Sequence, residues 1–162
     1  MAKAAIVMGS KSDYEVVRKA EEILNLFEIE YESRVISAHR TPQEAFDFAS
    51  SAHENGFDVI IAAAGKSAHL AGVMAAVSLL PVIGIPVKTQ FMGGLDSLLS
   101  VVQMPGGVPV ACVGVDGAAN AALLAAQMIS LREPGLRKKL AEYKESMRNE
   151  VLSADEDIRN FN

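Results

Sequence analysis

The sequence contains no tryptophan, one cysteine and three histidines among its 162 residues, and aromatic residues make up only 6% of it. Because Cys112 is alone, one chain can form neither an internal disulfide nor a zinc site built from several cysteines. No run of about 18 apolar residues free of charges and turn signals occurs, which argues against a membrane span. The amino terminus lacks a basic segment followed by an apolar core and a cleavage site, so we expect a cytoplasmic protein.

An excess of basic residues is also absent. The chain has 15 Lys and Arg residues against 20 Asp and Glu residues, which gives a formal net charge of -5 with the histidines neutral. A protein that binds the phosphate backbone of nucleic acid needs concentrated positive charge. We therefore expect no nucleic-acid partner and no membrane partner.

Small apolar residues are what the sequence has in abundance. Hydrophobic residues make up 50% of it and the mean hydropathy is +0.21, with Ala, Val, Leu, Ile and Met supplying the surplus. A chain of this length builds one sizeable core, so we predict a single domain over residues 1–162, with its core at 4–131 and a helical tail at 134–162. Small side chains let backbones approach closely, which suggests surface buried between subunits as well.

Short apolar runs alternate with segments of helical spacing. The expected strands are 4–8, 31–36, 59–64, 82–85 and 110–115, and the expected helices are 16–27, 42–55, 70–79, 96–102 and 118–131. Alternation of this kind favours a parallel sheet covered on both faces. We predict an α/β fold, namely a flavodoxin-like three-layer α/β/α sandwich around a five-stranded parallel sheet.

Two helices are candidates for contacts between subunits. The 118–131 segment is apolar nearly all round, which suits either a core helix of one chain or an interface. After Pro134, apolar residues recur at helical spacing, which predicts an amphipathic C-terminal helix. They are Leu136, Leu140, Tyr143, Met147 and Val151. We expect this face to pack on a neighbouring subunit, with packing on its own domain as the alternative.

Three polar loops follow expected strands, at 9–13, 37–42 and 65–72. Open parallel sheets bind ligands at the carboxyl ends of their strands, near the point where the strand order reverses. The loops should therefore form one site. In the first loop, amides at a helix start and the hydroxyls of Ser10 and Ser12 suit an anion. Ser12 or Asp13 equally suits a helix cap, and Asp13 would accept hydrogen bonds from sugar hydroxyls beside a phosphate.

The other two loops carry histidines. Arg40 offers a planar fork of donors that suits phosphate, and a histidine such as His39 can exchange protons near neutral pH. A lone loop histidine is more often a cap or a surface residue, but the setting between Ser37 and Arg40 favours function. The Gly-Lys-Ser of the third loop is not a nucleotide P-loop, because Ile60 stands where the upstream glycine belongs. We expect His53 to be solvated, and two loop histidines are weak support for zinc, so no metal is expected.

Six motifs in order make a family resemblance specific. They are MGSKSD at 8–13, SAHRTP at 37–42, AGKSAHL at 64–70, LPVIGIPV at 80–87, GLDSLLSVVQMPGGVPVA at 94–111 and NAALLAAQM at 120–128. Together they resemble the bacterial N5-carboxyaminoimidazole ribonucleotide mutases of purine biosynthesis, collinearly from residue 4 to about residue 150.

The resemblance implies a homo-octamer that moves a carboxylate from N5 to C4 of the ribonucleotide without metal, nucleotide or organic cofactor. It places the phosphate on Ser10, Ser37 and Arg40, the ribose on Asp13, and general acid and base chemistry on His39. It puts His69 on the loop that folds over the carboxylate and makes the 103–107 loop a wall of the pocket. The catalytic candidates are thus His39 and His69, and the substrate-binding candidates are Ser10, Ser12, Asp13, Ser37, Arg40, Gly65, Lys66, Ser67, Ala68 and Leu70.

One loop departs from the family pattern. The usual AGGAAHLPGM is AGKSAHLAGV here, and Lys66-Ser67 leans towards the animal-type aminoimidazole ribonucleotide carboxylases, which resemble AGRSNGL at this point and use free carbon dioxide. His69, Arg40 and the 80–111 region lean towards the mutase. Lys66 could pair with a substrate carboxylate or form a salt bridge at a subunit contact. A third interpretation is a non-catalytic nucleotide-binding module, which this fold class also supports.

Overall fold

The computed structural model describes residues 2–161, and it contains the predicted parallel sheet. Its five strands lie in the order β2-β1-β3-β4-β5, and every neighbouring pair is parallel. The strands are β1 (Lys3–Met8), β2 (Glu30–Val35), β3 (Val59–Ala64), β4 (Val82–Pro86) and β5 (Ala111–Cys112). This is the flavodoxin-like order, in which the chain first moves outward from β1 to β2 and then returns across β1 to β3. The predicted fold class is confirmed.

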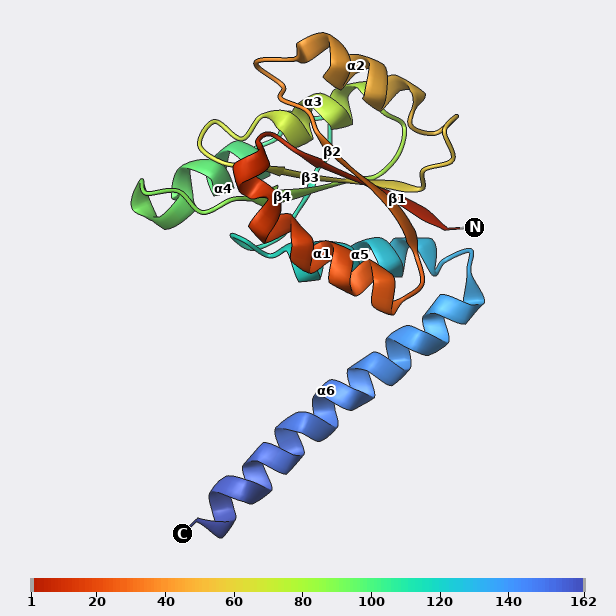
Figure 1. The fold of residues 1–162 in the computed structure, drawn as a ribbon, viewed down its shortest axis with the longest axis vertical. Coiled ribbons are helices and arrows are strands. Elements are labelled where there is room, and N and C mark those ends of the chain that lie inside the picture. The colour runs from red at the N-terminus through yellow and green to blue at the C-terminus, as the bar shows by residue number, and fades with distance from the viewer. Residues whose placement is uncertain (1, 162) are drawn as a thin grey trace.

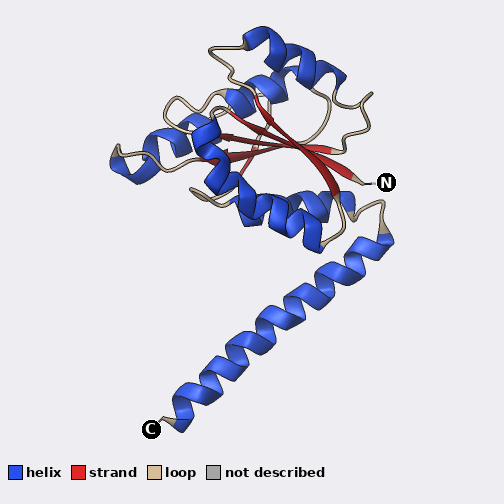
Figure 2. Cartoon of the chain, viewed as in Figure 1, coloured by secondary structure: helices blue, strands red, loops and turns tan. Residues whose placement is uncertain are grey.

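Helices cover both faces of the sheet, as Figures 1 and 2 show. They are α1 (Tyr14–Leu26), α2 (Pro42–Ser51), α3 (Leu70–Val77), α4 (Leu95–Val102), α5 (Ala118–Ile129) and α6 (Pro134–Asn160), with short 3-10 turns at Lys11–Asp13 and Met92–Gly94. Helices α1 and α5 pack on one face and α2 and α3 on the other, so the sheet is the middle of three layers.

The central strands are apolar on both sides because each side meets a helix layer. In β1, Ala4, Ile6 and Met8 face the core under α1 and α5, while Ala5 and Val7 face the core under α2 and α3. All five side chains are buried. A strand covered on both faces has a continuous run of apolar residues rather than an alternating one. The apolar run at 4–8 therefore predicts this strand correctly.

The fifth strand is shorter than predicted. The expected run was 110–115, but only Ala111 and Cys112 pair with β4, opposite Ile83 and Gly84. The chain then turns, and Asp116 adopts a left-handed backbone with a φ of 56°. The regular pairing has already ended at Cys112, although the N–H groups of Val113 and Asp116 still donate to Gly84 and Pro86, and the turn leads into α5. The ends of α2, α3 and α5 also fall two to four residues before their predicted ends at 55, 79 and 131.

Helix α5 belongs to the core of this chain. Ala121, Ala122, Ala125 and Ala126 are fully buried in the cluster that α5 shares with α1 and the sheet. Their methyl groups let the helix lie close to both neighbours. Of the two interpretations that the sequence left open for the 118–131 segment, the structure therefore supports the core helix.

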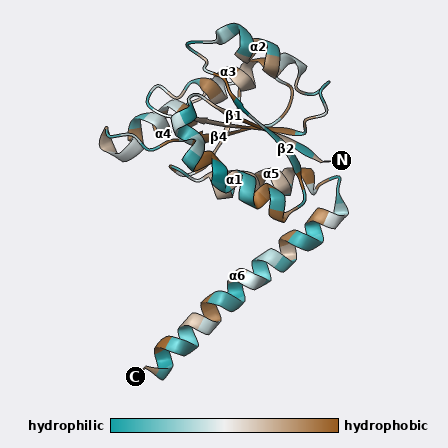
Figure 3. Ribbon diagram, in the orientation of Figure 1, coloured by the Kyte–Doolittle hydropathy of each residue, from teal (hydrophilic) through white to brown (hydrophobic). Residues whose placement is uncertain are grey.

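Helix α6 divides into two parts. Leu136 and Leu140 are buried against the domain, and the ring of Tyr143 lies 5.7 Å from that of Phe27, measured between centroids. Beyond them the helix runs away from the body of the molecule with Met147 and Val151 exposed. Figure 3 shows hydrophobic residues recurring along this outer part. Only the first turns thus pack on their own domain.

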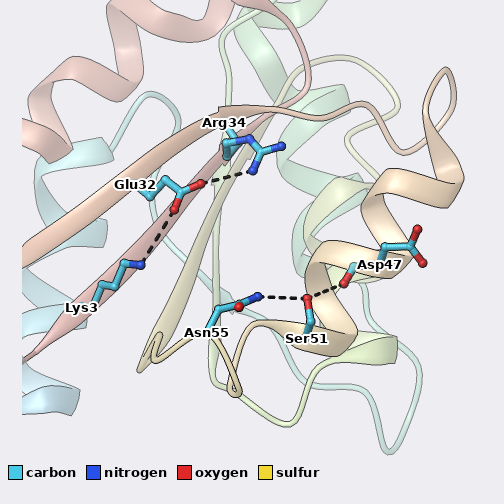
Figure 4. A network of polar contacts seen from close by, with 6 residues as sticks. All are labelled: Lys3, Glu32, Arg34, Asp47, Ser51 and Asn55. Carbon is cyan, nitrogen blue, oxygen red and sulfur yellow. Dashed lines mark hydrogen bonds and ion pairs between the residues drawn. The ribbon is translucent and has the colours of Figure 1, made fainter.

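Surface polar networks tie neighbouring segments together. Glu32 on β2 pairs with Lys3 on β1 at 3.8 Å and with Arg34 at 3.2 Å, and Ser51 links Asn55 to the backbone of Asp47 at the end of α2 (Figure 4). Exposed pairs of this kind contribute at most about 1 kcal/mol each. The apolar layers, not these contacts, stabilise the fold. None of the helices within residues 2–161 has the length and apolar character needed to cross a membrane.

Candidate active site

One cavity of about 1140 Å³ opens at the carboxyl ends of the strands. The three loops that the sequence analysis expected to meet all line it, although they lie far apart in the chain. The lining residues from these loops include Gly9, Ser10, Ser12, Asp13, Ser37, His39, Arg40, Gly65, Lys66, Ser67, His69 and Leu70. The strand order explains the convergence, because β2, β1 and β3 are neighbours and all point their carboxyl ends to one edge.

In the first loop, Ser10 caps the helical turn. Its Oγ accepts hydrogen bonds from the backbone N–H of Ser12 at 3.3 Å and from the hydroxyl of Ser12 at 3.0 Å. The capping interpretation for Ser12 or Asp13 is therefore wrong, since Asp13 makes no side-chain bond to the start of α1. Its carboxylate remains available to another partner within the cavity.

Asp13 is nearly buried, with only 9% of its surface exposed. Burial raises the pKa of its carboxyl group above the ordinary value, and this effect outweighs a backbone hydrogen bond from Ser10, the Ser12 hydroxyl and the nearby Arg40, which all lower the pKa. Holding this carboxylate charged while it is largely shielded from water is therefore costly. Hydroxyl donors of a ligand would replace the lost water.

Arg40 joins the second loop to the first. One guanidinium nitrogen, Nη2, donates to the carbonyl of Gly9 at 3.0 Å, and Nε lies 3.4 Å from the hydroxyl of Ser37. The loop itself is held by Thr41, whose Oγ1 accepts from the N–H of Ser37 at 2.9 Å. Two of the five N–H donors of the guanidinium are used in this way, which leaves three for an anion in the cavity.

The two loop histidines are in direct contact. Nε2 of His39 lies 2.8 Å from Nδ1 of His69, and the rings meet edge to face with centroids 4.9 Å apart. One of the two nitrogens carries the shared proton, so the tautomer of each ring depends on the other. Both rings are exposed to the cavity and can exchange protons with a ligand there. His53, in contrast, is exposed after α2 and does not line the cavity.

The third loop turns sharply at Lys66. Its φ is 56°, and its carbonyl accepts a hydrogen bond from the hydroxyl of Ser100 on α4 at 3.3 Å. Lys66 is exposed, lines the cavity and takes part in none of the ion pairs formed within residues 2–161. Ala68 does not line the cavity. It is 1% exposed and its methyl group packs in the core under α2 and α3, so its side chain faces away from the cavity, and its contact with substrate stays a prediction.

A fourth segment completes the cavity and escaped the sequence analysis. Residues 87–91 follow β4 directly and form a wall, and Asp96 and Ser100 on α4 also line the cavity. The hydroxyl of Thr89 donates to Asp96 at 2.7 Å, which joins the wall to that helix. The same rule that selected the other loops applied here, because β4 lies beside β3 and ends at the same edge.

The 103–107 loop lies elsewhere in this chain. None of its residues lines the cavity, and Met104 instead covers Gly72 of α3 so closely that a Cβ there would lie 3.3 Å from Cε of the methionine. The predicted wall from this loop is therefore replaced, within one chain, by 87–91 and α4.

A family model described as AIR carboxylase matches residues 3–150. The chain belongs to the AIR carboxylase family. Among family relatives, the N5-carboxyaminoimidazole ribonucleotide mutase of Pyrococcus abyssi is 53% identical over 148 residues, which cover 91% of this chain and 85% of that protein. The mutase of Escherichia coli K12 is 49% identical over 153 residues, which cover 93% of this chain and 90% of that one.

Two further similar proteins differ in name or in length from these mutases. The chloroplastic phosphoribosylaminoimidazole carboxylase of Vigna aconitifolia is 49% identical over 146 residues, which make up only 26% of that longer protein. The crystal structure of Treponema denticola PurE superposes with a TM-score of 0.87 at 29% identity, covering 97% of this chain and 98% of that one. The family's fold thus extends over nearly the whole chain.

Proposed function

We propose that this protein is an N5-carboxyaminoimidazole ribonucleotide mutase, an isomerase that converts its substrate to 4-carboxy-5-aminoimidazole ribonucleotide in purine biosynthesis. Relatives of that name are about 50% identical over more than nine-tenths of the chain. The observation that carries the proposal is the His39–His69 hydrogen bond in a cavity that also contains Arg40 and Asp13. The single sheet supplies every loop of this cavity, so residues 1–162 would act as one catalytic domain.

The strand order suggests how a ribonucleotide would lie. Arg40 follows β2 and Lys66 follows β3, two strand positions away, which corresponds to roughly 10 Å across the sheet. That span suits a phosphate at Arg40, Ser10 and Ser37, with the ring towards the third loop. Asp13 ends the 3-10 turn that follows β1, the strand between β2 and β3, and would accept hydrogen bonds from the ribose hydroxyls. Ser12, Gly65, Ser67 and Leu70 would complete the contacts with the ligand.

His39 would act as both general acid and general base. A proton from its imidazolium to N5 breaks the bond between N5 and the carboxylate carbon, and the bonding electrons stay on nitrogen as carbon dioxide forms. The C4 carbon of the ring then donates an electron pair to the captured carbon dioxide, and the neutral imidazole removes the proton from C4. One imidazole that first gives up a proton and then takes one up can serve both steps. His69 would hold the ring of His39 in place through their hydrogen bond.

Lys66 would stabilise the carboxylate during this transfer. Its ammonium has no acidic partner among the described residues, and its backbone is held by Ser100 at the edge of the cavity. A cation beside the ring would favour the bound carboxylate electrostatically. The alternative function is direct carboxylation of aminoimidazole ribonucleotide by free carbon dioxide, which Lys66-Ser67 and the carboxylase relative from Vigna aconitifolia favour.

The fate of a labelled carboxylate distinguishes the two reactions. We expect N5-carboxyaminoimidazole ribonucleotide carrying ¹³C in its carboxylate to give the C4-carboxylated product with the label retained, in buffer that contains unlabelled bicarbonate. The measurement is ¹³C NMR of substrate and product. Carboxylation of free aminoimidazole ribonucleotide alone, at a rate that follows dissolved carbon dioxide, would identify the carboxylase instead. Binding of either ribonucleotide without turnover would indicate a non-catalytic module.

We also infer a homo-oligomer, and the octamer implied by the family resemblance is our specific expectation. The outer part of α6 exposes Met147 and Val151, which are four residues apart and share one helix face, and exposed apolar residues on one face favour association. Sedimentation of the full chain should therefore give a mass several times the 17.2 kDa of one chain. A stable monomer would contradict this inference.

A further inference from the structure

Asp116 is hydrogen-bonded to the start of the cavity wall but does not line the cavity itself. It lies in the turn between β5 and α5, and its backbone N–H donates to the carbonyl of Pro86 at 2.9 Å. Its carboxylate oxygen Oδ1 accepts a hydrogen bond from the N–H of Lys88 at 2.8 Å. The two bonds bind one residue to both sides of Val87, at the point where β4 becomes the wall.

With the two bonds to Asp116, consecutive backbone groups from the carbonyl of Pro86 to the N–H of Lys88 are all hydrogen-bonded. Between its two partners, the N–H of Val87 donates to Ala64 at 2.9 Å and the carbonyl of Val87 accepts from the hydroxyl of Ser97 at 2.6 Å. The next backbone group, the N–H of Lys88, is the one bound by the Asp116 carboxylate. The following residue, Thr89, donates its hydroxyl to Asp96. Loss of the Asp116 carboxylate would therefore release the wall at its base.

The backbone of Asp116 is suited to few residues. Its φ of 56° is a left-handed conformation, which glycine, asparagine and aspartate adopt most readily. An acceptor on a short side chain is also needed to reach the N–H of Lys88. These two requirements can be separated by substitution, because asparagine meets both, glycine meets only the first and alanine meets neither.

We propose that Asp116 is a positioning residue that holds the 87–91 wall in place and so keeps carbon dioxide in the cavity between the two steps of the mutase reaction. The inference rests on the proposed function, since carbon dioxide is released at N5 before it is recaptured at C4. An enclosed pocket keeps the captured molecule at high effective concentration. A loosened wall allows it to escape, so that aminoimidazole ribonucleotide, with the proton on N5, leaves as a side product.

The test compares Asp116→Asn, Asp116→Gly and Asp116→Ala in the full chain. Two quantities are measured, namely the hydrogen-exchange rate of the Lys88 amide and the fraction of turnovers that release aminoimidazole ribonucleotide. We expect Asp116→Asn to behave as the wild type. Asp116→Gly should raise the exchange rate of the Lys88 amide and the released fraction by about fivefold, which is the change expected from the loss of one hydrogen bond. The KM of the ribonucleotide should change little. Asp116→Ala should do the same and also lower the urea midpoint.

Glu28→Gly is the matched control, because Glu28 has a φ of 57° and carries a carboxylate far from the cavity lining. It should leave both measurements unchanged. An Asp116→Gly variant with wild-type exchange at Lys88 and wild-type release would overturn the proposal. If the wild type fails to interconvert the ribonucleotides, the proposed function and the role in carbon dioxide retention fall together. The Lys88 exchange then still decides whether Asp116 holds the wall.

Discussion

Substitution of His39 by asparagine is expected to lower kcat by about 10²- to 10⁴-fold, the usual contribution of a positioned general acid and base. Asparagine is polar and of similar size, so it can preserve the loop and its contact with His69. It has no group that gains and loses a proton near neutral pH. Chemistry should therefore fail while the phosphate and ribose contacts at Arg40 and Asp13 persist.

The measurement combines single-turnover kinetics with equilibrium binding of the C4-carboxylated ribonucleotide. His53→Asn is the control, because His53 is an exposed histidine outside the cavity lining and its loss should leave kcat unchanged. Turnover of His39→Asn at the wild-type rate would contradict the proton-transfer role. Loss of both turnover and binding would assign His39 to the structure of the binding site instead.

Asp13→Asn is expected to make the empty protein more stable at neutral pH and to weaken substrate binding. Burial raises the pKa of the Asp13 carboxyl, so the folded state favours the protonated form more than the unfolded state does. The resulting stability is present below the unfolded pKa of about 3.8 and is lost as pH rises through the raised folded value. Above that pH range the charged carboxylate costs stability, and asparagine removes this cost.

Two measurements check the Asp13 prediction. Urea unfolding from acidic to neutral pH should show the variant and the wild type converging at acidic pH and the variant ahead at pH 7. Binding of the ribonucleotide should weaken about 30-fold, because a neutral amide loses about 2 kcal/mol of charge-assisted bonding to the ribose hydroxyls. The control is Asp47→Asn on the exposed face of α2, which should change neither quantity. An unchanged affinity would remove Asp13 from the ribose site, and a pH-independent difference in stability would contradict its burial as the cause.

The local pattern was sufficient where neighbouring elements impose one environment along a whole segment. Strand β3 was predicted at 59–64 and is found there, because helix layers on both faces require apolar residues throughout. Strand β5 was predicted at 110–115 and is much shorter. The apolar residues continue to Val115, but regular pairing with β4 ends at Cys112, and beyond it single backbone bonds join Val113 to Gly84 and Asp116 to Pro86. Residue type alone does not show where pairing ends, because apolar residues occupy both the paired and the unpaired part of this segment.

The candidate site also has features that the sequence predicts and features that it does not. The residue types of the three loops, and the rule that parallel strands present their carboxyl ends at one edge, placed most of the candidate residues together without coordinates. The 2.8 Å contact between His39 and His69 was beyond that reasoning, because the two residues are 30 positions apart. So was the reach of Arg40 to the carbonyl of Gly9.

By itself, then, the sequence determined the layer architecture, the strand-end location of the site and the chemistry of its side chains. These follow from periodicity and from residue type, which are local properties. Only the tertiary structure decided which nitrogens share a proton, that Ala68 faces the core, that 87–91 lines the cavity within one chain, and that Asp116 accepts a hydrogen bond from Lys88. Each of these depends on distances between segments remote in the chain, which packing of the helices on the sheet sets and no local pattern contains.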